Sequence, residues 1–299
     1  MNIRTKDRVT ALVLAVVMSL GATGTARAFE PWSDVNGYWV AGDGLTVIDD
    51  AVEKGVTITK YQNKAGDINW KKVFLDDISF AMVRLGYYND QDPYFDVNMK
   101  SAESVGIKTG VCFYGSAVGT EEAREEARYV LDIIKDYRVS YPVGYDLDSA
   151  ELEDMKLSKK QITDQINAFC EVIEAAGYPV IVFGDYEWLR KSVDIRNMPY
   201  DIWYNRAGVI HNFQNRVMWR CTDRGEVQGI TGQVCLEFSF DDYSESFPSD
   251  GWREINGTEY YFINHRMAKS RTLRIDEGIY VFDEDGKSYA RKDYIRGFQ

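Results

Sequence analysis

Two aspartates stand two residues apart in the middle of the chain, in Asp146-Leu147-Asp148. They end a β-rich run, residues 143–148, and side chains two apart on a strand point to the same face, so both carboxylates would aim at one space. Two adjacent carboxylates repel each other as anions, which raises the pKa of one and separates an acid role from a base role. That pairing is the chemistry of glycoside cleavage. The alternative is an ordinary acidic loop, because Glu151, Glu153 and Asp154 follow closely.

An alternation of β-rich runs and helical patterns surrounds these acids and must position them. Strands are expected at residues 56–61, 80–85, 107–114, 143–148, 179–183, 201–204, 216–221 and 234–238, with helical segments after each of the first five. Asp92-Pro93 is expected to open the helix after the second strand, with Asp92 as its N-cap. Repeated strand–helix units predict parallel strands covered by helices. Eight strands close naturally into a barrel whose catalytic groups lie at the C-terminal strand ends.

The predicted fold class is therefore α/β: a TIM-like barrel of five βα units plus three further strands, with a small C-terminal β-hairpin module. The first residues have another character. Arg4, Lys6 and Arg8 precede the apolar run 9–20 and the small residues of Ala26-Arg27-Ala28, which is the order of a secretory signal. The alternative is an uncleaved anchor helix, although the run is short for a membrane span. The expected organisation is a signal peptide at 1–28, a lead-in at 29–54, the barrel at 55–243 and the module at 249–299.

The charge of the chain limits its partners. It carries 47 acidic and 35 basic residues, a formal net charge of −12 at pH 7. Such a chain would be repelled by nucleic acid and by anionic lipid, so neither is expected as a partner, and no membrane contact is expected once the signal is cleaved. A hydrophobic content of 45% and an aromatic content of 14% exclude disorder. We expect a secreted or cell-wall-associated monomer.

The four cysteines are Cys112, Cys170, Cys221 and Cys235, and their spacing fits no zinc motif. Cys170 falls on the apolar face of a helix, where it is expected to act as a small buried hydrophobe. Cys221 and Cys235 lie on the last two expected strands, which adjoin in the barrel, so they are candidates for a disulfide. Free thiols are the alternative, as in an anaerobic habitat.

Several segments keep the order of a known family. Val56 to Val73, which includes Asp67-Ile68-Asn69-Trp70-Lys71-Lys72-Val73, resembles the opening of glycoside hydrolase family 25, the Chalaropsis-type lysozymes. Further matches are Val83-Arg84-Leu85-Gly86-Tyr87, Asp92-Pro93-Tyr94-Phe95, Tyr141-Pro142-Val143, Tyr200-Asp201-Ile202-Trp203, Met218-Trp219 and Gly229-Ile230-Thr231-Gly232. The resemblance implies the same barrel and N-acetylmuramidase activity on peptidoglycan glycan strands, with no metal and no cofactor. It also implies that the substrate is contacted by Tyr87, Tyr114, Trp203 and Trp219.

Within this resemblance the active-site acids do not all carry over. The family's opening strand has an Asp where this chain has Thr57, and its last strand has an Asp where this chain has Cys235. The family's Asp-x-Glu aligns with Asp146 and Asp148, so the first acid is kept and the proton-donating Glu is shortened. The Gln that commonly follows Met/Ile-Trp is Arg220.

These changes predict impaired catalysis. The shorter side chain of Asp148 withdraws its carboxyl by about one C–C bond, roughly 1.5 Å, and a misplacement near 1 Å costs on the order of 10²-fold in rate. Arg220 is expected to pair with Asp148 and hold it ionised, which is wrong for a proton donor. The chain is thus either a slow muramidase or a pseudoenzyme that binds wall glycan through the same groove. A scaffold that binds a protein partner is a third possibility.

The tail contains two aromatic repeats. Gly251-Trp252 leads to 256–262, which contains Asn256-Gly257 and Tyr260-Tyr261-Phe262, and a weaker copy spans 276–282. Each copy is a polar turn followed by alternating aromatics, which predicts a β-hairpin. The tail resembles the cell-wall-binding repeats of choline- and glucan-binding proteins, which implies wall binding by Trp252, Tyr260, Tyr261, Tyr280 and Phe282. The alternative is a hairpin that docks on the barrel and only stabilises it.

Overall fold

The computed structural model describes residues 31–87, 90–147, 152, 155–212 and 215–290. The expected signal peptide at 1–28 and the predicted catalytic residue Asp148 lie outside the described residues. No helix in these ranges is both long enough and apolar enough to cross a bilayer.

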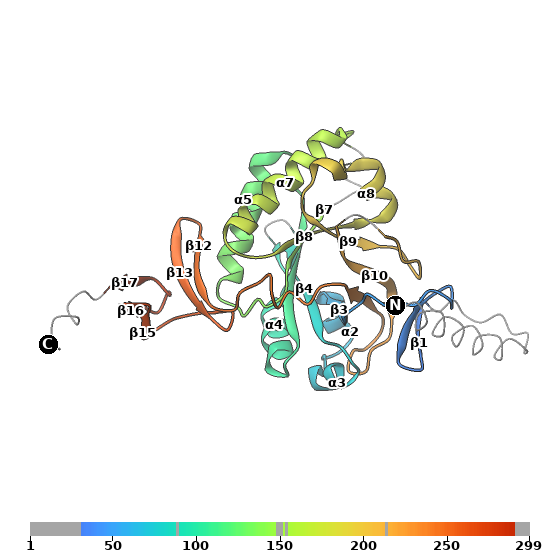
Figure 1. Cartoon of the computed structure of the whole chain (residues 1–299), viewed down its shortest axis with the longest axis horizontal. Helices are drawn as coiled ribbons and strands as arrows, with labels where there is room; N and C mark the ends of the chain where they lie inside the picture. The colour runs from blue at the N-terminus through green and yellow to red at the C-terminus, as the bar shows by residue number, and fades with distance from the viewer. Residues whose placement is uncertain (1–30, 88–89, 148–151, 153–154, 213–214, 291–299) are drawn as a thin grey trace, which may run out of the picture.

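Eight strands close into a barrel, as predicted (Figure 1). They are β3 (Glu53–Ile58), β4 (Phe80–Tyr87), β6 (Lys108–Gly115), β7 (Val143–Leu147), β8 (Val180–Asp185), β9 (Asp201–Asn205), β10 (Arg216–Gly225) and β11 (Val234–Ser239). Neighbours from β3 to β10 are parallel, whereas β11 runs antiparallel to both β10 and β3. Because β3 pairs with both β4 and β11, the sheet has no open edge at that point. A two-residue strand, β5 (Asp90–Gln91), extends the sheet at β4.

Helices follow the first five barrel strands, which confirms the five βα units. They are α2 (Lys60–Ala65), α3 (Trp70–Leu75), α4 (Phe95–Ser104), α5 (Thr120–Ile134), α7 (Lys159–Ala175) and α8 (Tyr186–Ser192), with a short 3₁₀ turn at Ile195–Asn197. The helix α7 begins at a capping box in which Ser158 accepts from the Gln161 backbone N–H and Gln161 reaches back to Ser158. α5 and α7 lie side by side on the outside of the barrel (Figure 1).

The start of α4 differs from the prediction. The helix begins at Phe95 with Tyr94 as its N-cap residue, and no side chain caps it. The carboxylate of Asp92 instead accepts the backbone N–H groups of Tyr94 (3.0 Å) and Lys60 (2.8 Å) and pairs with Arg84 (3.2 Å). The buried carboxylate of Asp92 therefore ties the ends of β3 and β4 together, because the charge of the half-buried Arg84 offers it a stronger partner than a helix end does.

The barrel interior is packed around Trp203 on β9. This side chain is fully buried, and its six-membered ring lies against Gly144 on β7. A Cβ atom at Gly144 would lie 3.0 Å from Trp203 Cζ3, so glycine is needed there for the indole to enter the barrel. The lead-in forms a hairpin, β1 (Trp32–Val35) and β2 (Tyr38–Ala41). Its Trp32 and Trp39 pack on Phe238 of β11, with ring centroids 5.6 and 5.1 Å apart.

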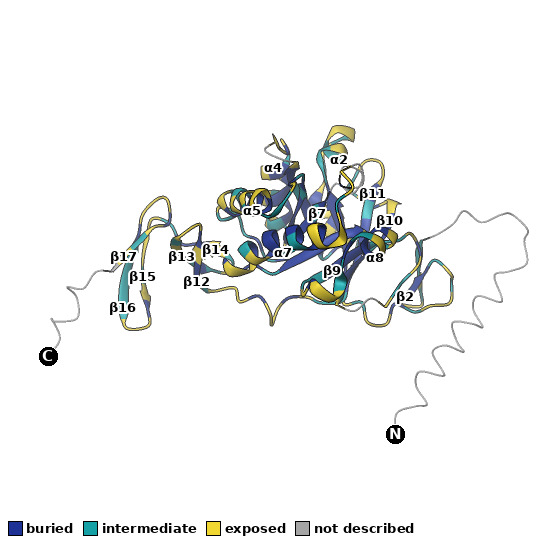
Figure 2. Ribbon diagram, turned by 90° about the horizontal axis from the view of Figure 1, so that it is seen from above, coloured by how far each residue is buried: buried dark blue, intermediate teal, exposed yellow. Residues whose placement is uncertain are grey.

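The tail forms two small antiparallel sheets, which confirms the predicted hairpins and adds a third strand to each. The first contains β12 (Gly251–Ile255), β13 (Thr258–Ile263) and β14 (Arg266–Met267), and the second contains β15 (Arg271–Ile275), β16 (Gly278–Phe282) and β17 (Ser288–Ala290). The β12–β13 turn is Asn256-Gly257, both at positive φ (51° and 76°), as a two-residue hairpin turn requires. Figure 2 shows the second sheet farther from the barrel than the first.

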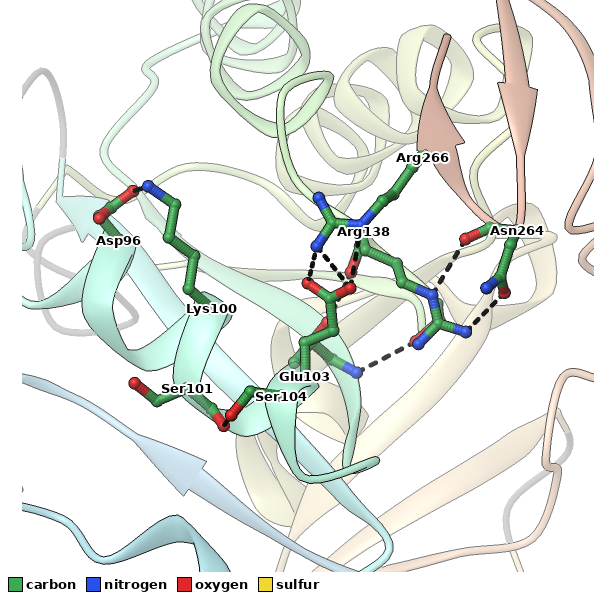
Figure 3. A network of polar contacts seen from close by, with 10 residues as sticks. Asp96, Lys100, Ser101, Glu103, Ser104, Arg138, Asn264 and Arg266 are labelled. Atoms are coloured by element: carbon green, nitrogen blue, oxygen red, sulfur yellow. Dashed lines mark hydrogen bonds and ion pairs between the residues drawn. The ribbon is translucent and has the colours of Figure 1, made fainter.

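The first tail sheet docks on the barrel. The guanidinium of Arg253 is buried between the rings of Tyr178 (4.9 Å), Phe247 (4.7 Å) and Phe262 (4.3 Å). Around this contact, Arg138 of the barrel donates to Asn264, and Arg266 pairs with Glu103 of α4 at 2.5 Å (Figure 3). The docking alternative therefore describes the first tail sheet in this structure.

The second tail sheet has a small core of its own, made by Ala268, Ile275 and Phe282. Trp252 bridges the two sheets, with its ring 5.1 Å from Tyr261 and 5.1 Å from Tyr280. Of the five aromatics predicted to bind wall, Tyr260 and Phe282 are buried, while Trp252 is 37% exposed and Tyr261 and Tyr280 are half-buried. Only the last three retain surface that a ligand could reach.

Two deletions should separate the roles of the tail sheets. Removing residues 249–299 uncovers the buried rings of Tyr178 and Phe247, so it should lower stability by about 3 kcal/mol or more. Removing only 270–299 should leave the melting temperature of the barrel nearly unchanged, because the first sheet stays docked. Thermal unfolding followed by near-UV circular dichroism measures both. Equal melting of the longer deletion and the whole chain would contradict a stabilising role for docking.

Candidate active-site groove

The predicted site residues come together at the C-terminal ends of the barrel strands. Strand pairing sets Tyr87 beside Tyr114, and Tyr114 beside Asp146. On the other side of β4, the next two strands are β3 and β11, and their pairing sets Thr57 beside Cys235. Asp146 is half-buried at the end of β7, where the sequence placed it.

The centre of the candidate site, beneath these residues, is Glu237, which was not predicted from the sequence. Its side chain is fully buried, and both carboxylate oxygens are hydrogen-bonded. Oε1 accepts from Thr57 Oγ1 (2.7 Å) and Arg220 Nε (2.8 Å), and Oε2 accepts from the indole N–H of Trp203 (2.8 Å). Arg220 Nη2 also donates to Thr57 Oγ1 (3.1 Å). We call Thr57, Trp203, Arg220 and Glu237 the floor network.

A sequence signal for Glu237 existed. It stands alone as an acid within the apolar run 234–238, two residues after Cys235. Residues two apart on a strand share a face, so an inward Cys235 implies an inward Glu237. An acid with no water around it requires paired donors, and Arg220 on the next strand is the expected cation.

Arg220 stays cationic in this setting. Burial alone would lower its pKa, but the neighbouring charge of Glu237 outweighs that effect and raises the pKa above its ordinary value. The guanidinium also lies over the rings of Phe183 (4.2 Å) and Trp203 (4.9 Å). Within the described residues, Arg220 pairs with Glu237, and the pairing with Asp148 that was predicted from the sequence falls on a residue outside them.

The thiols in the floor carry no charge. Burial raises the pKa of Cys235, and the nearby Arg220 only partly offsets this. Burial, followed by the charge of Asp146, also raises the pKa of Cys112. A neutral thiol at position 235 therefore does not replace the carboxylate that the family resemblance implies there.

The predicted disulfide between Cys221 and Cys235 is wrong, because both are free thiols in this structure. The register of β10 against β11 shifts between Arg220 and Thr222, so Cys221 is the extra residue at an irregularity. Arg220 points to Glu237 inside the barrel, and strand alternation then directs Cys221 away from the interior face that Cys235 shares.

The four aromatics predicted to contact substrate divide into two pairs. Tyr87 is 42% exposed and Tyr114 half-buried, with ring centroids 5.2 Å apart at the rim of the groove. Trp203 and Trp219 are fully buried and offer no ring face to a ligand. Trp203 serves the floor network, and Trp219 packs on Phe238 (5.8 Å) and donates to the carbonyl of Arg206. For these two, packing outweighs the role that the resemblance implied.

The hydrogen bonds of the floor network determine which of its groups are available for chemistry. Glycoside cleavage needs one protonated acid and one carboxylate on either side of the bond. Among the described residues, Glu237 accepts hydrogen bonds from three side chains, and the hydroxyl of Thr57 donates one of them. Asp146 is the one family acid that keeps its carboxylate in this part of the chain.

Comparison with known proteins gives a family. The family model described as Glycosyl hydrolases family 25 matches residues 56–230, which is more than half of the chain. The protein YegX of Escherichia coli K12, whose function is uncharacterized, is 24% identical over 195 residues, covering 60% of this chain and 66% of YegX. The chain thus spans about two thirds of that relative.

Solved structures share the fold. The autolysin LytC from Streptococcus pneumoniae, in complex with a synthetic peptidoglycan ligand, is 23% identical with a TM-score of 0.61, over 69% of this chain and 51% of LytC. A family 25 glycosyl hydrolase from Bacillus anthracis is 18% identical with a TM-score of 0.58, over 72% and 95%. A bacterial lysozyme from Streptomyces coelicolor is 20% identical with a TM-score of 0.52, over 62% and 90%.

Removing one partner of the buried pair should be costly. Arg220→Gln leaves the charge of Glu237 without its cation and should lower stability by about 3–5 kcal/mol at pH 7. The double variant Arg220→Gln, Glu237→Gln should recover most of that loss, since no buried charge remains. Urea unfolding measures both variants, and a loss below about 1 kcal/mol in the single variant would match an exposed pair instead.

Proposed function

Since this chain belongs to glycosyl hydrolases family 25, we propose that it binds the glycan strands of bacterial peptidoglycan in the groove and cleaves them poorly or not at all. The proposal of poor cleavage rests on the floor network. Glu237 is buried beneath Arg220 and held by three donors, so it is neither a free base nor a proton donor. Thr57 and a neutral Cys235 supply no carboxylate in its place.

Binding is supported by what the groove retains. Tyr87 and Tyr114 offer a partly exposed aromatic surface at the rim, and aromatic faces suit the apolar faces of sugar rings. Asp146 stands beside them as a hydrogen-bond acceptor for sugar hydroxyls. LytC, which shares the barrel, was solved with a synthetic peptidoglycan ligand. The proposal includes export, on the order of basic, apolar and small residues in 1–28.

One incubation tests both halves. Purified peptidoglycan is mixed with the protein, and pelleted protein and soluble reducing ends are scored together. We expect pelleting with little release of reducing ends. Tyr87→Ala should reduce pelleting severalfold, whereas Tyr38→Ala, which removes an exposed tyrosine of the lead-in hairpin, should not. Release at a rate ordinary for lysozymes would contradict impaired cleavage, and absence of pelleting would contradict glycan binding.

Restoring the acids should restore cleavage if the scaffold is otherwise intact. Thr57→Asp alone would set a second carboxylate against Glu237, so it is combined with Glu237→Gln, and the new acid then takes Arg220 as its partner. Adding Asp148→Glu and Cys235→Asp restores the family pattern. General acid catalysis contributes about 10²–10⁴-fold, so reducing-end release should rise well above that of the native chain.

Asp146→Asn in the restored protein is the control and should abolish the gain, because it removes the acid that the chain already has. A restored, folded protein that pellets with wall and still releases no sugar would show that the groove differs in more than its acids.

A further inference from the structure

A pocket lies at the end of the barrel where the parallel strands begin, opposite the end that carries Asp146 and Tyr114. It has a volume of about 390 Å³ and opens where β8 and β9 begin and where the chain leaves β11. Three acidic residues line it: Asp201 at the start of β9 and Asp241 just after β11, which are half-buried, and Glu174 near the end of α7, which is exposed. Its remaining wall includes the ring of Tyr200 and the apolar surface of Pro179 and Pro199.

The two half-buried carboxylates, Asp201 and Asp241, have no cationic side chain as a partner in the described ranges. Burial and the charge of Asp241 raise the pKa of Asp201, as expected for two like charges close together. Lys108 pairs with Glu53 (2.8 Å). The guanidinium of Arg253 packs on the ring of the lining residue Tyr178 (4.9 Å) and donates to the carbonyl of Pro248 (2.9 Å), and it pairs with no carboxylate in the described ranges.

A buried hydroxyl also lacks a partner here. Tyr243 lines the pocket and is only 4% exposed, its ring packs on Tyr141 (5.0 Å), and its Oη makes no hydrogen bond to the described chain. Its backbone N–H donates to Asp241 Oδ1 (2.7 Å), and burial together with the charges of Asp201 and Asp241 raises the pKa of its hydroxyl. A buried polar group without a partner is costly, so this oxygen points to a ligand that can donate to it.

The chemistry of the lining selects the ligand. Two anions and a phenol oxygen are acceptors for the three N–H donors of an ammonium group, and tyrosine faces attract cations. Prolines and rings along the wall suit a carbon chain. A metal ion fits poorly, because the described residues contain no group of three His, Cys, Asp or Glu side chains placed to hold one. We propose that this pocket binds a primary ammonium group carried on an aliphatic chain, as in the side chain of lysine or a free diamine.

Isothermal titration calorimetry of the purified protein tests this proposal with two amines. 1,5-Diaminopentane represents a free diamine, and Nα-acetyl-L-lysine amide represents a lysine within a peptide. We expect saturable binding of at least one of them, and the tighter one identifies the source. 1-Pentanol, which has the same chain without charge, should not bind measurably. Equal binding of pentanol, or heat from calcium chloride with none from either amine, would overturn the proposal.

Variants locate the binding. Asp201→Asn should weaken amine affinity by about 10-fold or more, since it removes a charged acceptor. Glu171→Gln, an exposed acid on α7 that removes the same charge outside the pocket, should change nothing. Tyr243→Phe keeps the ring packing and should weaken affinity without lowering the melting temperature, whereas a purely structural hydroxyl would lower it. Unchanged affinity in both Asp201→Asn and Tyr243→Phe would overturn the proposal.

Discussion

The buried ion pair between Arg220 and Glu237 constrains the rest of the groove. A fully buried carboxylate is tolerated only when its charge is balanced and its oxygens are satisfied. Thr57, Trp203 and Arg220 meet that demand together, each from a different strand. Once they do, none of them is available to a substrate as an acid, a base or an exposed ring. The chemistry of the floor is therefore set by Glu237, a residue that no sugar reaches.

The barrel makes this network possible through its last strand. β11 runs antiparallel between β10 and β3, so its inward residues face Arg220 on one side and Thr57 on the other. The third donor comes across the barrel, because Gly144 leaves room for the indole of Trp203. The closure of the barrel by β11 thus brings a cation and a hydroxyl to the same buried carboxylate.

Periodicity predicted the architecture well, since five βα units, three further strands and two hairpins are all local patterns in the sequence. What failed depended on partners that are distant in sequence. The Asp92 carboxylate binds Arg84 rather than capping α4, and Glu237, the partner of Arg220, was not predicted as a site residue. Trp203 and Trp219 are buried, although the family resemblance implied sugar contact. Strand spacing placed Asp146 correctly, because a strand end is a local feature, but only the closed barrel shows which side chains meet inside it.

The pattern of substitutions argues against simple decay of an active site. Loss of acids alone would leave cavities and unmatched donors in the floor. Here no atom of the floor network is among the buried polar groups that lack a partner in the described chain. Neighbouring acids in an active site repel one another, and this repulsion lowers the stability of the folded protein. In this floor Glu237 pairs with Arg220, and a hydroxyl and a neutral thiol stand where the family resemblance implies acids, so the floor is polar without that repulsion. An ordered, nearly neutral floor beside Asp146 and the tyrosine rim suits the binding of uncharged sugar hydroxyls, which need fixed partners but no proton.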